Sequence, residues 1–257
     1  MKTVEECVVM AMDGTEAELF PYLPYILQDL WEIGADPETV IHLIEKHANR
    51  YTELKVLDLG CGKGAVSVKL AAALGCQCHG IDAIPEFIGH ARQKALEYGV
   101  QHLCTFETGD IRAKIHEWSG YDIIILGAIG PVFGNYFTTL TKLSPCINER
   151  GFIIIDDGYV EDNSNFIHPL IMKQSVIFDQ VKSAGMQLID EIIISKNEII
   201  ESDDLIFNLL EKRCLELIRR HPQKSELFKR YIKNQEIENE VLANRVICST
   251  MVVQPVS

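Results

Sequence analysis

Positive charge is scarce in this sequence, and it contains no long run of lysine or arginine. The 24 Lys and Arg residues are outnumbered by 37 Asp and Glu residues, which gives a formal net charge of −13 and a pI near 5.1. Because this balance repels polyphosphates and anionic membrane surfaces, we expect neither a nucleic-acid partner nor a membrane partner. The sequence also lacks an apolar run of the length that a signal peptide or a membrane span needs, so a cytoplasmic location is predicted.

The eight cysteines do not follow the pattern of a structural zinc site. Cys76 and Cys78 form one close pair, and no second pair follows at zinc-ligand spacing. On a strand, two residues at this spacing simply face the same side of a sheet. Without a secretory signal, the cysteines are predicted to be reduced thiols.

Strands and helices alternate through the middle of the chain. Apolar runs predict strands at 55–59, 76–82, 103–108, 121–127, 151–156, 187–194 and 246–254. Helical patterns lie between them, at about 64–74, 85–98, 133–143 and 172–184. Continuous apolar strands are buried on both faces, and β-α alternation produces parallel sheets. We therefore predict an α/β fold with a doubly wound, Rossmann-like, mostly parallel seven-stranded sheet and helices on both faces.

Two mainly helical segments lie outside this alternation. Residues 51–196 and 245–257 form the predicted core, residues 1–50 an N-terminal helical extension, and residues 197–244 a helical insertion before the last strand. An insertion of this length within a compact domain is often functional. It is expected to serve either as a lid over a ligand or as a dimer interface, and both alternatives stay open.

Three glycines alternate in the turn after the first predicted strand. Residues 56–65 read Val-Leu-Asp-Leu-Gly-Cys-Gly-Lys-Gly-Ala, so that Asp58 near the strand end is followed by Gly60, Gly62 and Gly64. Glycine permits a positive φ and lets a ligand approach the bare backbone beside a helix N-terminus. The spacing is one residue shorter than the Gly-x-Gly-x-x-Gly motif that receives the pyrophosphate of a dinucleotide.

Acidic or small residues also stand at the ends of the next three strands. Asp82 closes the second strand, where an acid binds ribose hydroxyls in doubly wound folds, although capping of the next helix is an alternative role. Asp110 and Ile111 follow the third strand, and Gly127 ends the fourth. Because the carboxyl ends of neighbouring strands bind ligands in open α/β sheets, these segments predict one shared ligand site.

Across roughly residues 50–195 and the last strand, the sequence resembles the class I S-adenosylmethionine-dependent methyltransferases. The resemblance implies S-adenosylmethionine as the cofactor, Asp58 as the residue that orders the glycine loop, and the Gly127 backbone as the partner of the methionine ammonium. The cofactor-binding residues that it implies are Asp58, Gly60, Cys61, Gly62, Gly64, Asp82, Ala83, Asp110, Ile111 and Gly127.

The same resemblance assigns parts of the cofactor to particular residues. Gly60 and Gly62 would admit its methionine end, and Asp82 would hold the ribose hydroxyls. Asp110 and the Ile111 amide would bind the adenine ring.

The implied activity is in-line methyl transfer to a small-molecule acceptor. No Asn/Asp-Pro-Pro-Tyr/Phe pattern follows the fourth strand, which disfavours adenine-N6 and glutamine acceptors. The acceptor atom stays open among N, O, S, C and a metalloid, and so does a homodimer. Two rival interpretations are an NAD(P)-dependent oxidoreductase, disfavoured by the glycine spacing, and a non-enzymatic cofactor-binding member of the same fold.

Polar side chains near the strand ends supply weak candidates for a catalytic role, and no general base is identified. These candidates are Asp156, Asp157, Tyr159 and His168. Asp156 and Asp157 resemble the carboxylates of metal-dependent catechol-type O-methyltransferases. Gly127 and Ala128 occupy the position where that family supplies a further carboxylate, so no metal is predicted.

An aromatic segment in the N-terminal extension is a candidate lid. Tyr22, Tyr25 and Trp31 lie in a proline-punctuated run that is predicted to close over cofactor and substrate. Packing against the core is the alternative role for these rings.

Overall fold

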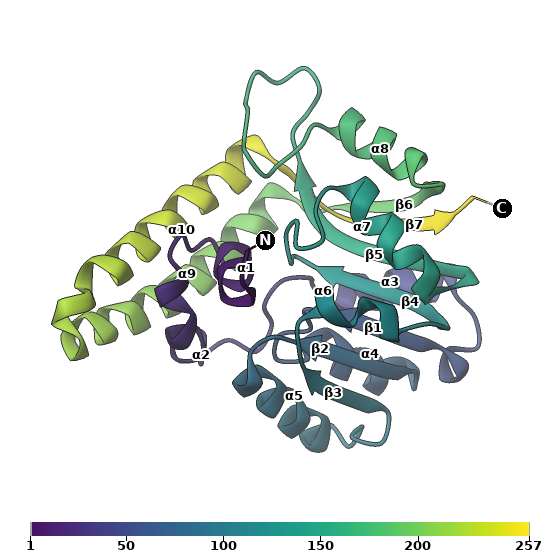
Figure 1. Ribbon diagram of the computed structural model, residues 1–257, viewed down its shortest axis with the longest axis horizontal. Helices are drawn as coiled ribbons and strands as arrows, with labels where there is room; N and C mark the ends of the chain where they lie inside the picture. Colours follow the sequence, from purple (N-terminus) through teal and green to yellow (C-terminus); the bar gives the residue numbers. More distant parts are fainter. Residues whose placement is uncertain (1, 257) are drawn as a thin grey trace.

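The computed structural model describes residues 2–256 and contains a seven-stranded sheet (Figure 1). Its strands are β1 (Lys55–Leu59), β2 (Gln77–Asp82), β3 (Cys104–Thr108), β4 (Tyr121–Gly127), β5 (Ile147–Tyr159), β6 (Met186–Ile193) and β7 (Ile247–Pro255). They lie in the order β3-β2-β1-β4-β5-β7-β6, with β1 to β5 parallel and β7 antiparallel to both of its neighbours. The predicted doubly wound, mostly parallel sheet is confirmed.

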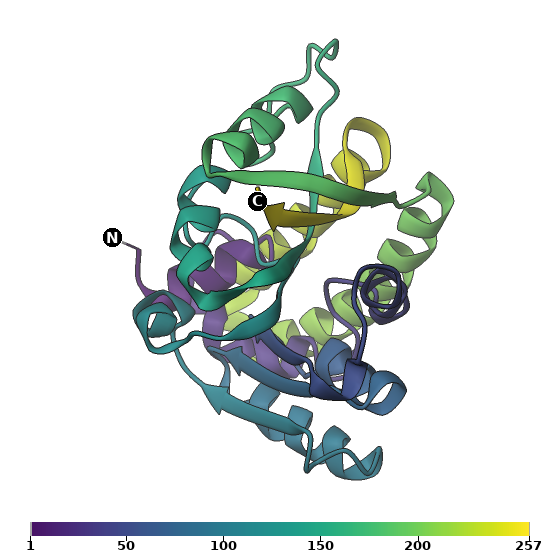
Figure 2. The same ribbon diagram turned by 90° about the vertical axis from the view of Figure 1, so that its right-hand side faces the viewer.

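Helices cover both faces of this sheet (Figures 1 and 2). One face packs against α3 (Pro37–His47), α4 (Ala65–Leu74) and α5 (Pro85–Glu97), and the other against α6 (Ile111–Lys114), α7 (Tyr136–Leu143) and α8 (Gln174–Ser183). Short 3₁₀ turns η2 (Tyr51–Glu53), η3 (Ile115–Glu117) and η4 (Ser144–Cys146) connect these elements.

The alternation of side chains along β4 shows why its whole apolar run is buried. Ile123 and Ile125 belong to the core under α3, α4 and α5, whereas Ile124 and Leu126 belong to the core under α6, α7 and α8. Successive residues of a strand point to opposite faces, so a strand covered on both sides needs an apolar residue at every position.

The remaining helices, which we call the appended helices, share a third buried cluster that also includes Ile84 and Phe87 at the start of α5. They are α1 (Val4–Ala11), η1 (Ala17–Tyr22), α2 (Leu23–Ile26), α9 (Lys196–Arg220), η5 (Pro222–Lys224) and α10 (Ser225–Arg245). In Figure 1, α9 and α10 lie side by side to the left of the sheet, with α1 and α2 between them and the strands. Leu23 and Ile26 of α2 share a buried cluster with Leu210 and Phe228 of the long pair, so the two predicted appendages pack on each other.

The elements agree closely with the predicted ones, with one clear exception. The strand predicted at 151–156 runs over Ile147–Tyr159, because Asp157, Gly158 and Tyr159 continue to pair with β7 beyond the parallel ladder with β4. Within residues 2–256, none of the helices combines the length and apolar character required to cross a bilayer.

Candidate functional site

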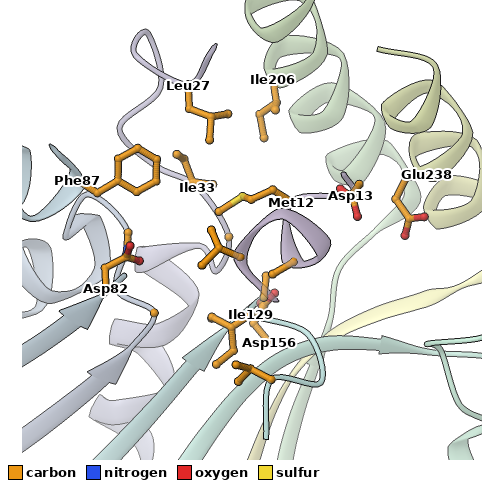
Figure 3. Close-up of a pocket in the computed structure, with 18 of the residues that line it drawn as sticks. Met12, Asp13, Leu27, Ile33, Asp82, Phe87, Ile129, Asp156, Ile206 and Glu238 are labelled. Atoms are coloured by element: carbon orange, nitrogen blue, oxygen red, sulfur yellow. The ribbon is translucent and has the colours of Figure 1, made fainter. Parts of the chain in front are cut away.

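A cavity of about 760 Å³ lies beyond the carboxyl ends of β1, β2, β3 and β4 (Figure 3). Its size lies within the range of small-molecule sites. One half is lined by the strand ends and the other by α1, α9 and α10. From the predicted cofactor site, Gly60, Gly62, Asp82, Ala83, Asp110, Ile111 and Gly127 line it. The structure therefore brings together the residues that follow four different strands.

The glycine loop after β1 adopts a backbone that requires glycine. Gly60 and Gly62 have φ values of 73° and 54°, and both line the cavity. A Cβ atom on Gly60 would lie 2.5 Å from Cγ2 of Ile129. Gly64, at φ 75°, lies behind the loop, where a Cβ atom would meet that of Ala91 at 2.7 Å. Two glycines thus open the cavity wall, and the third lets α4 approach α5.

Asp82 holds this loop in place. Its Oδ2 accepts a hydrogen bond from the Gly62 amide at 2.9 Å, and its Oδ1 accepts one from the Ile84 amide at 2.8 Å. Ile84 precedes α5, so the carboxylate orders the turn before the helix and does not bond within its first turn. Burial raises the pKa of Asp82 to about 6. A buried acceptor therefore faces the cavity at the position predicted for ribose recognition.

Asp58 and Cys61 lie behind the loop and do not line the cavity. The Asp58 carboxylate is buried and accepts a hydrogen bond from the Ser67 hydroxyl at 2.6 Å, which ties β1 to α4. Burial raises the pKa of Asp58 to about 6 and raises the pKa of the Cys61 thiol well above its usual value. These two residues support the loop from below.

Asp110 is held by a residue that the sequence analysis did not single out. The Arg112 guanidinium donates to Asp110 at 2.9 Å and thereby lowers the pKa of that carboxyl. The same guanidinium donates to the Lys2 carbonyl and to Sγ of Cys7, each at 3.0 Å. Arg112 therefore connects the end of β3 to helix α1, which forms part of the opposite cavity wall.

Asp156 is the member of the predicted catalytic group that lines the cavity. It accepts a hydrogen bond from the Thr250 hydroxyl at 2.7 Å, and burial raises its pKa to about 6. The structure places the other three candidates elsewhere. Asp157 accepts from the Tyr136 hydroxyl, Tyr159 is buried against Phe178, and His168 stacks on Phe166 in the loop after β5.

The aromatic rings of the predicted lid pack on neighbouring elements and are not among the residues that line the cavity. Tyr22 packs against Phe228, the Tyr25 hydroxyl donates to Glu216, and the Trp31 indole donates to the Lys63 carbonyl at 3.1 Å. Each of the three side chains thus packs against, or donates a hydrogen bond to, a neighbouring segment. The cavity is lined instead by the smaller residues of the same segment: Leu27, Ile33, Gly34, Asp36 and Thr39.

Lys63, between two of the loop glycines, fastens this segment to the site. Its ammonium is buried and donates to the carbonyls of Leu27 and Leu30, each at 2.5 Å. Desolvation lowers the pKa of Lys63 to about 8. Nothing in the sequence indicated this role for Lys63 beyond its position in the glycine loop, because the acceptors are backbone atoms more than thirty residues away.

Gly34 sets the distance between the same segment and the end of β4. Its φ is 87°, and a Cβ atom there would lie 2.7 Å from the Gly127 carbonyl oxygen. We expect Gly34→Ala to lower the free energy of unfolding by about 2–4 kcal/mol, since steric conflict adds to about 1–2 kcal/mol of left-handed strain. Chemical denaturation of the wild-type protein and the variant measures this loss of stability.

The matched control for this variant is Gly185→Ala. Gly185 has φ 72°, and a Cβ atom there would have no neighbour within 4 Å, so only backbone strain is expected. Equal losses in the two variants would show that the contact with Gly127 is not tight in solution.

The raised pKa of Asp156 predicts a pH dependence of stability. Its folded pKa of about 6 exceeds the ordinary value of 3.8, so between these values the folded state holds more protons and gains stability as pH falls. From pH 7 to 5.5, wild type should gain roughly 1 kcal/mol relative to Asp156→Asn. Denaturation of both proteins at the two pH values measures the difference. A constant difference would contradict the buried carboxylate.

Within residues 2–256, no group of three or more His, Cys, Asp and Glu side chains is arranged to hold a metal ion. Cys76 and Cys78 are buried neighbours with their sulfur atoms 3.7 Å apart.

Comparison with known proteins adds to this geometry. A family model described as "Methyltransferase domain" matches residues 51–242. The fold is similar to S-adenosylhomocysteine complexes of SAM-dependent methyltransferases from two organisms. The structure from Thiobacillus denitrificans has a TM-score of 0.72 at 14% identity, covering 91% of this chain and 97% of that one. The structure from Geobacter sulfurreducens has a TM-score of 0.70 at 15% identity, covering 90% and 96%.

Curated relatives match over short segments only. The 23S rRNA (uracil(1939)-C(5))-methyltransferase RlmD of Shewanella sp. (strain ANA-3) is 38% identical over 68 residues, which is 26% of this chain and 15% of the relative. Norajmaline N-methyltransferase of Rauvolfia serpentina is 31% identical over 70 residues, or 27% of this chain and 24% of the relative. This chain therefore spans less than a quarter of the length of these relatives.

Proposed function

The chain belongs to the methyltransferase domain family, and on that premise we propose that it transfers the methyl group of S-adenosylmethionine to a small molecule bound in the cavity. The observation that carries the proposal is the continuity of the cavity from four strand ends to the appended helices. One half is suited to the cofactor, and the other half is left for an acceptor.

The strand ends offer the contacts that the cofactor requires. In this proposal the buried Asp82 carboxylate accepts from the ribose hydroxyls, and Gly60 and Gly62 leave room for the methionine part. Asp110, kept ionised by Arg112, accepts from the adenine amine. All five of these residues line the cavity, and the Gly62 amide also donates a hydrogen bond to Asp82.

The chemistry asks little more of the chain than alignment and exclusion of water. The sulfonium of S-adenosylmethionine supplies an activated methyl group, so the protein must place the acceptor in line with it. Asp156 faces the cavity with a pKa of about 6, and in this proposal it accepts a proton from an acceptor that must lose one.

The appended helices choose the acceptor in this proposal. Helices α1, α9 and α10 supply the cavity wall opposite the strand ends, with side chains that include Val8, Ile206 and Leu210. A polynucleotide acceptor is not favoured, because the cavity wall is acidic and the chain carries a net charge of −13.

Mass spectrometry of purified protein incubated with S-adenosylmethionine and fractionated metabolite pools tests the proposal. We expect acceptor-dependent formation of S-adenosylhomocysteine together with a product heavier by one methylene. Asp82→Ala, in which cofactor binding should be weaker, serves as the reference with reduced activity. Absence of product from every pool, with S-adenosylhomocysteine still bound by the protein, would favour the non-enzymatic alternative.

A further inference from the structure

Three carboxylates from three different elements line the part of the cavity that the cofactor contacts leave free. Asp13 follows α1, Asp203 lies on α9 and Glu238 lies on α10. Figure 3 shows Asp13 and Glu238 beside one another, on the side of the cavity away from Asp82. We refer to Asp13, Asp203 and Glu238 as the acidic trio.

The acidic trio lacks an internal counter-ion. Among the described residues, no lysine or arginine lies within ion-pair distance of any of the three. Gln235 donates to the Asp13 carboxylate at 3.0 Å, but the enclosed Oδ2 of Asp203 has no hydrogen-bond partner. A carboxylate oxygen removed from water without a donor is costly, so a donor supplied by a ligand would be stabilising.

The carboxylates of the trio also act on one another. Burial and mutual repulsion raise the pKa of Asp13 to about 6 and that of Asp203 to about 6, and they raise the pKa of Glu238. Charge on His168 acts in the opposite direction on Asp13, and Asp204 adds to the repulsion on Asp203. Near neutral pH the trio is therefore a region of concentrated negative charge that is only partly relieved within the protein.

The rest of the cavity wall has the same sign of charge. Its carboxylates are Asp13, Asp36, Asp82, Asp110, Asp156, Glu198, Asp203 and Glu238. Among the described lining residues the one basic side chain is Arg112, which is already engaged by Asp110. A carboxylate or phosphate group on the acceptor would meet repulsion throughout, whereas a cation would be attracted.

Apolar side chains surround the acidic trio. They are Val8 of α1, Met12 directly after α1, Ile206 of α9 and Leu242 of α10, and all four line the same half of the cavity. Burial of an apolar surface against them provides affinity that is independent of charge. The site is therefore suited to a molecule with a hydrocarbon body and one cationic group.

We propose that the acceptor is an apolar amine bound as its ammonium ion, with the nitrogen held by the acidic trio and the hydrocarbon part against Val8, Met12 and Ile206. The inference rests on the proposed function, because it names the substrate class of the same cavity. It assigns recognition to the trio, and it concerns the binding step alone.

Calorimetric titration of protein saturated with S-adenosylhomocysteine tests this inference with three matched probes. The probes are 3-phenylpropylamine, 3-phenylpropanoate and 3-phenylpropan-1-ol, which share one apolar body and differ in charge. At pH 7.5 the amine should bind at least tenfold more tightly than either of the others. Equal binding by all three, preference for the carboxylate, or no binding of the amine would each overturn the inference.

A pair of double variants shows whether the trio is responsible. Asp203→Asn with Glu238→Gln should weaken amine binding at least tenfold, because both groups keep their shape and lose their charge. Glu201→Gln with Glu240→Gln changes the net charge equally at exposed positions of the same two helices and should leave amine binding unchanged. Equal loss in both variants would overturn the inference.

The same titrations separate this inference from the proposed function. S-adenosylhomocysteine binding depends on the strand ends and should be unchanged in both double variants, which also verifies that they fold. Failure of the wild-type protein to bind S-adenosylhomocysteine contradicts the proposed function. Normal S-adenosylhomocysteine binding without preference for the amine contradicts this inference alone.

Discussion

Asp82→Ala should weaken S-adenosylmethionine binding by about 1.5–3 kcal/mol, roughly 10- to 150-fold, the range for hydrogen bonds to a charged group. The expected loss has two sources. The ribose hydroxyls lose their acceptor, and the Gly62 and Ile84 amides lose the carboxylate that orders them. Because the second effect disturbs the glycine loop itself, the upper part of the range is expected.

Isothermal calorimetry with S-adenosylmethionine measures this loss, and thermal denaturation verifies that the variant folds. Asp122→Ala is a matched control. Asp122 also accepts a backbone amide, that of Lys55 at 2.9 Å, but it lies at the amino end of the strands. Unchanged affinity in folded Asp82→Ala protein would remove Asp82 from the cofactor site.

Replacing residues 198–243 with a short glycine-containing hairpin should abolish transfer to the natural acceptor. The replacement removes the α9 and α10 wall, including Ile206, Leu210 and Glu238. The strand ends remain, so most of the affinity for S-adenosylhomocysteine should persist. Stability should fall, because α2 and η1 lose the buried cluster that they share with the two long helices.

Sedimentation velocity and turnover per subunit distinguish the two roles of these helices. If they form a dimer interface, the shortened protein will sediment as a monomer and retain its turnover, and the lid hypothesis will be wrong. Ile206→Trp gives a gentler test, because it fills the same wall without removing a helix. Leu205→Trp is its control, since Leu205 is 61% exposed beside it. Only Ile206→Trp should reduce transfer.

The core of the fold was predictable because each of its elements carries a local signal. Continuous apolar runs such as 123–126 fit strands covered on both faces. The glycines at 60, 62 and 64 are required because the short loop after β1 needs a positive φ at each of these positions. The position of Asp82 at the cavity was predictable for the same reason, since Asp82 is the last residue of β2. Local chemistry therefore identified half of the cavity.

The other half of the cavity depends on contacts between distant segments, which the spacing of residues in the sequence does not predict. Tyr22 and Tyr25 were expected to face a ligand, but the rotation of their helical segment is set by packing against α9 and α10. The acidic trio combines residues 13, 203 and 238, which come together only when the appended helices pack. Aromatic rings bury a large surface, whether against a ligand or against the protein. Tyr22 and Tyr25 bury theirs against the protein.

The two bonds of the Lys63 ammonium have a consequence for how the site opens. The backbone of Lys63 is part of the glycine loop, and its side-chain ammonium donates hydrogen bonds to the carbonyls of Leu27 and Leu30. Residues 27–31 therefore cannot swing away from the cavity without leaving a buried ammonium unpaired or pulling on the loop. Opening of one segment is thermodynamically linked to disorder in the other, so their amide hydrogens should exchange as one cooperative unit. By reciprocity, a ligand that binds more tightly when residues 27–31 are closed and the glycine loop is ordered also stabilises the closed position of residues 27–31.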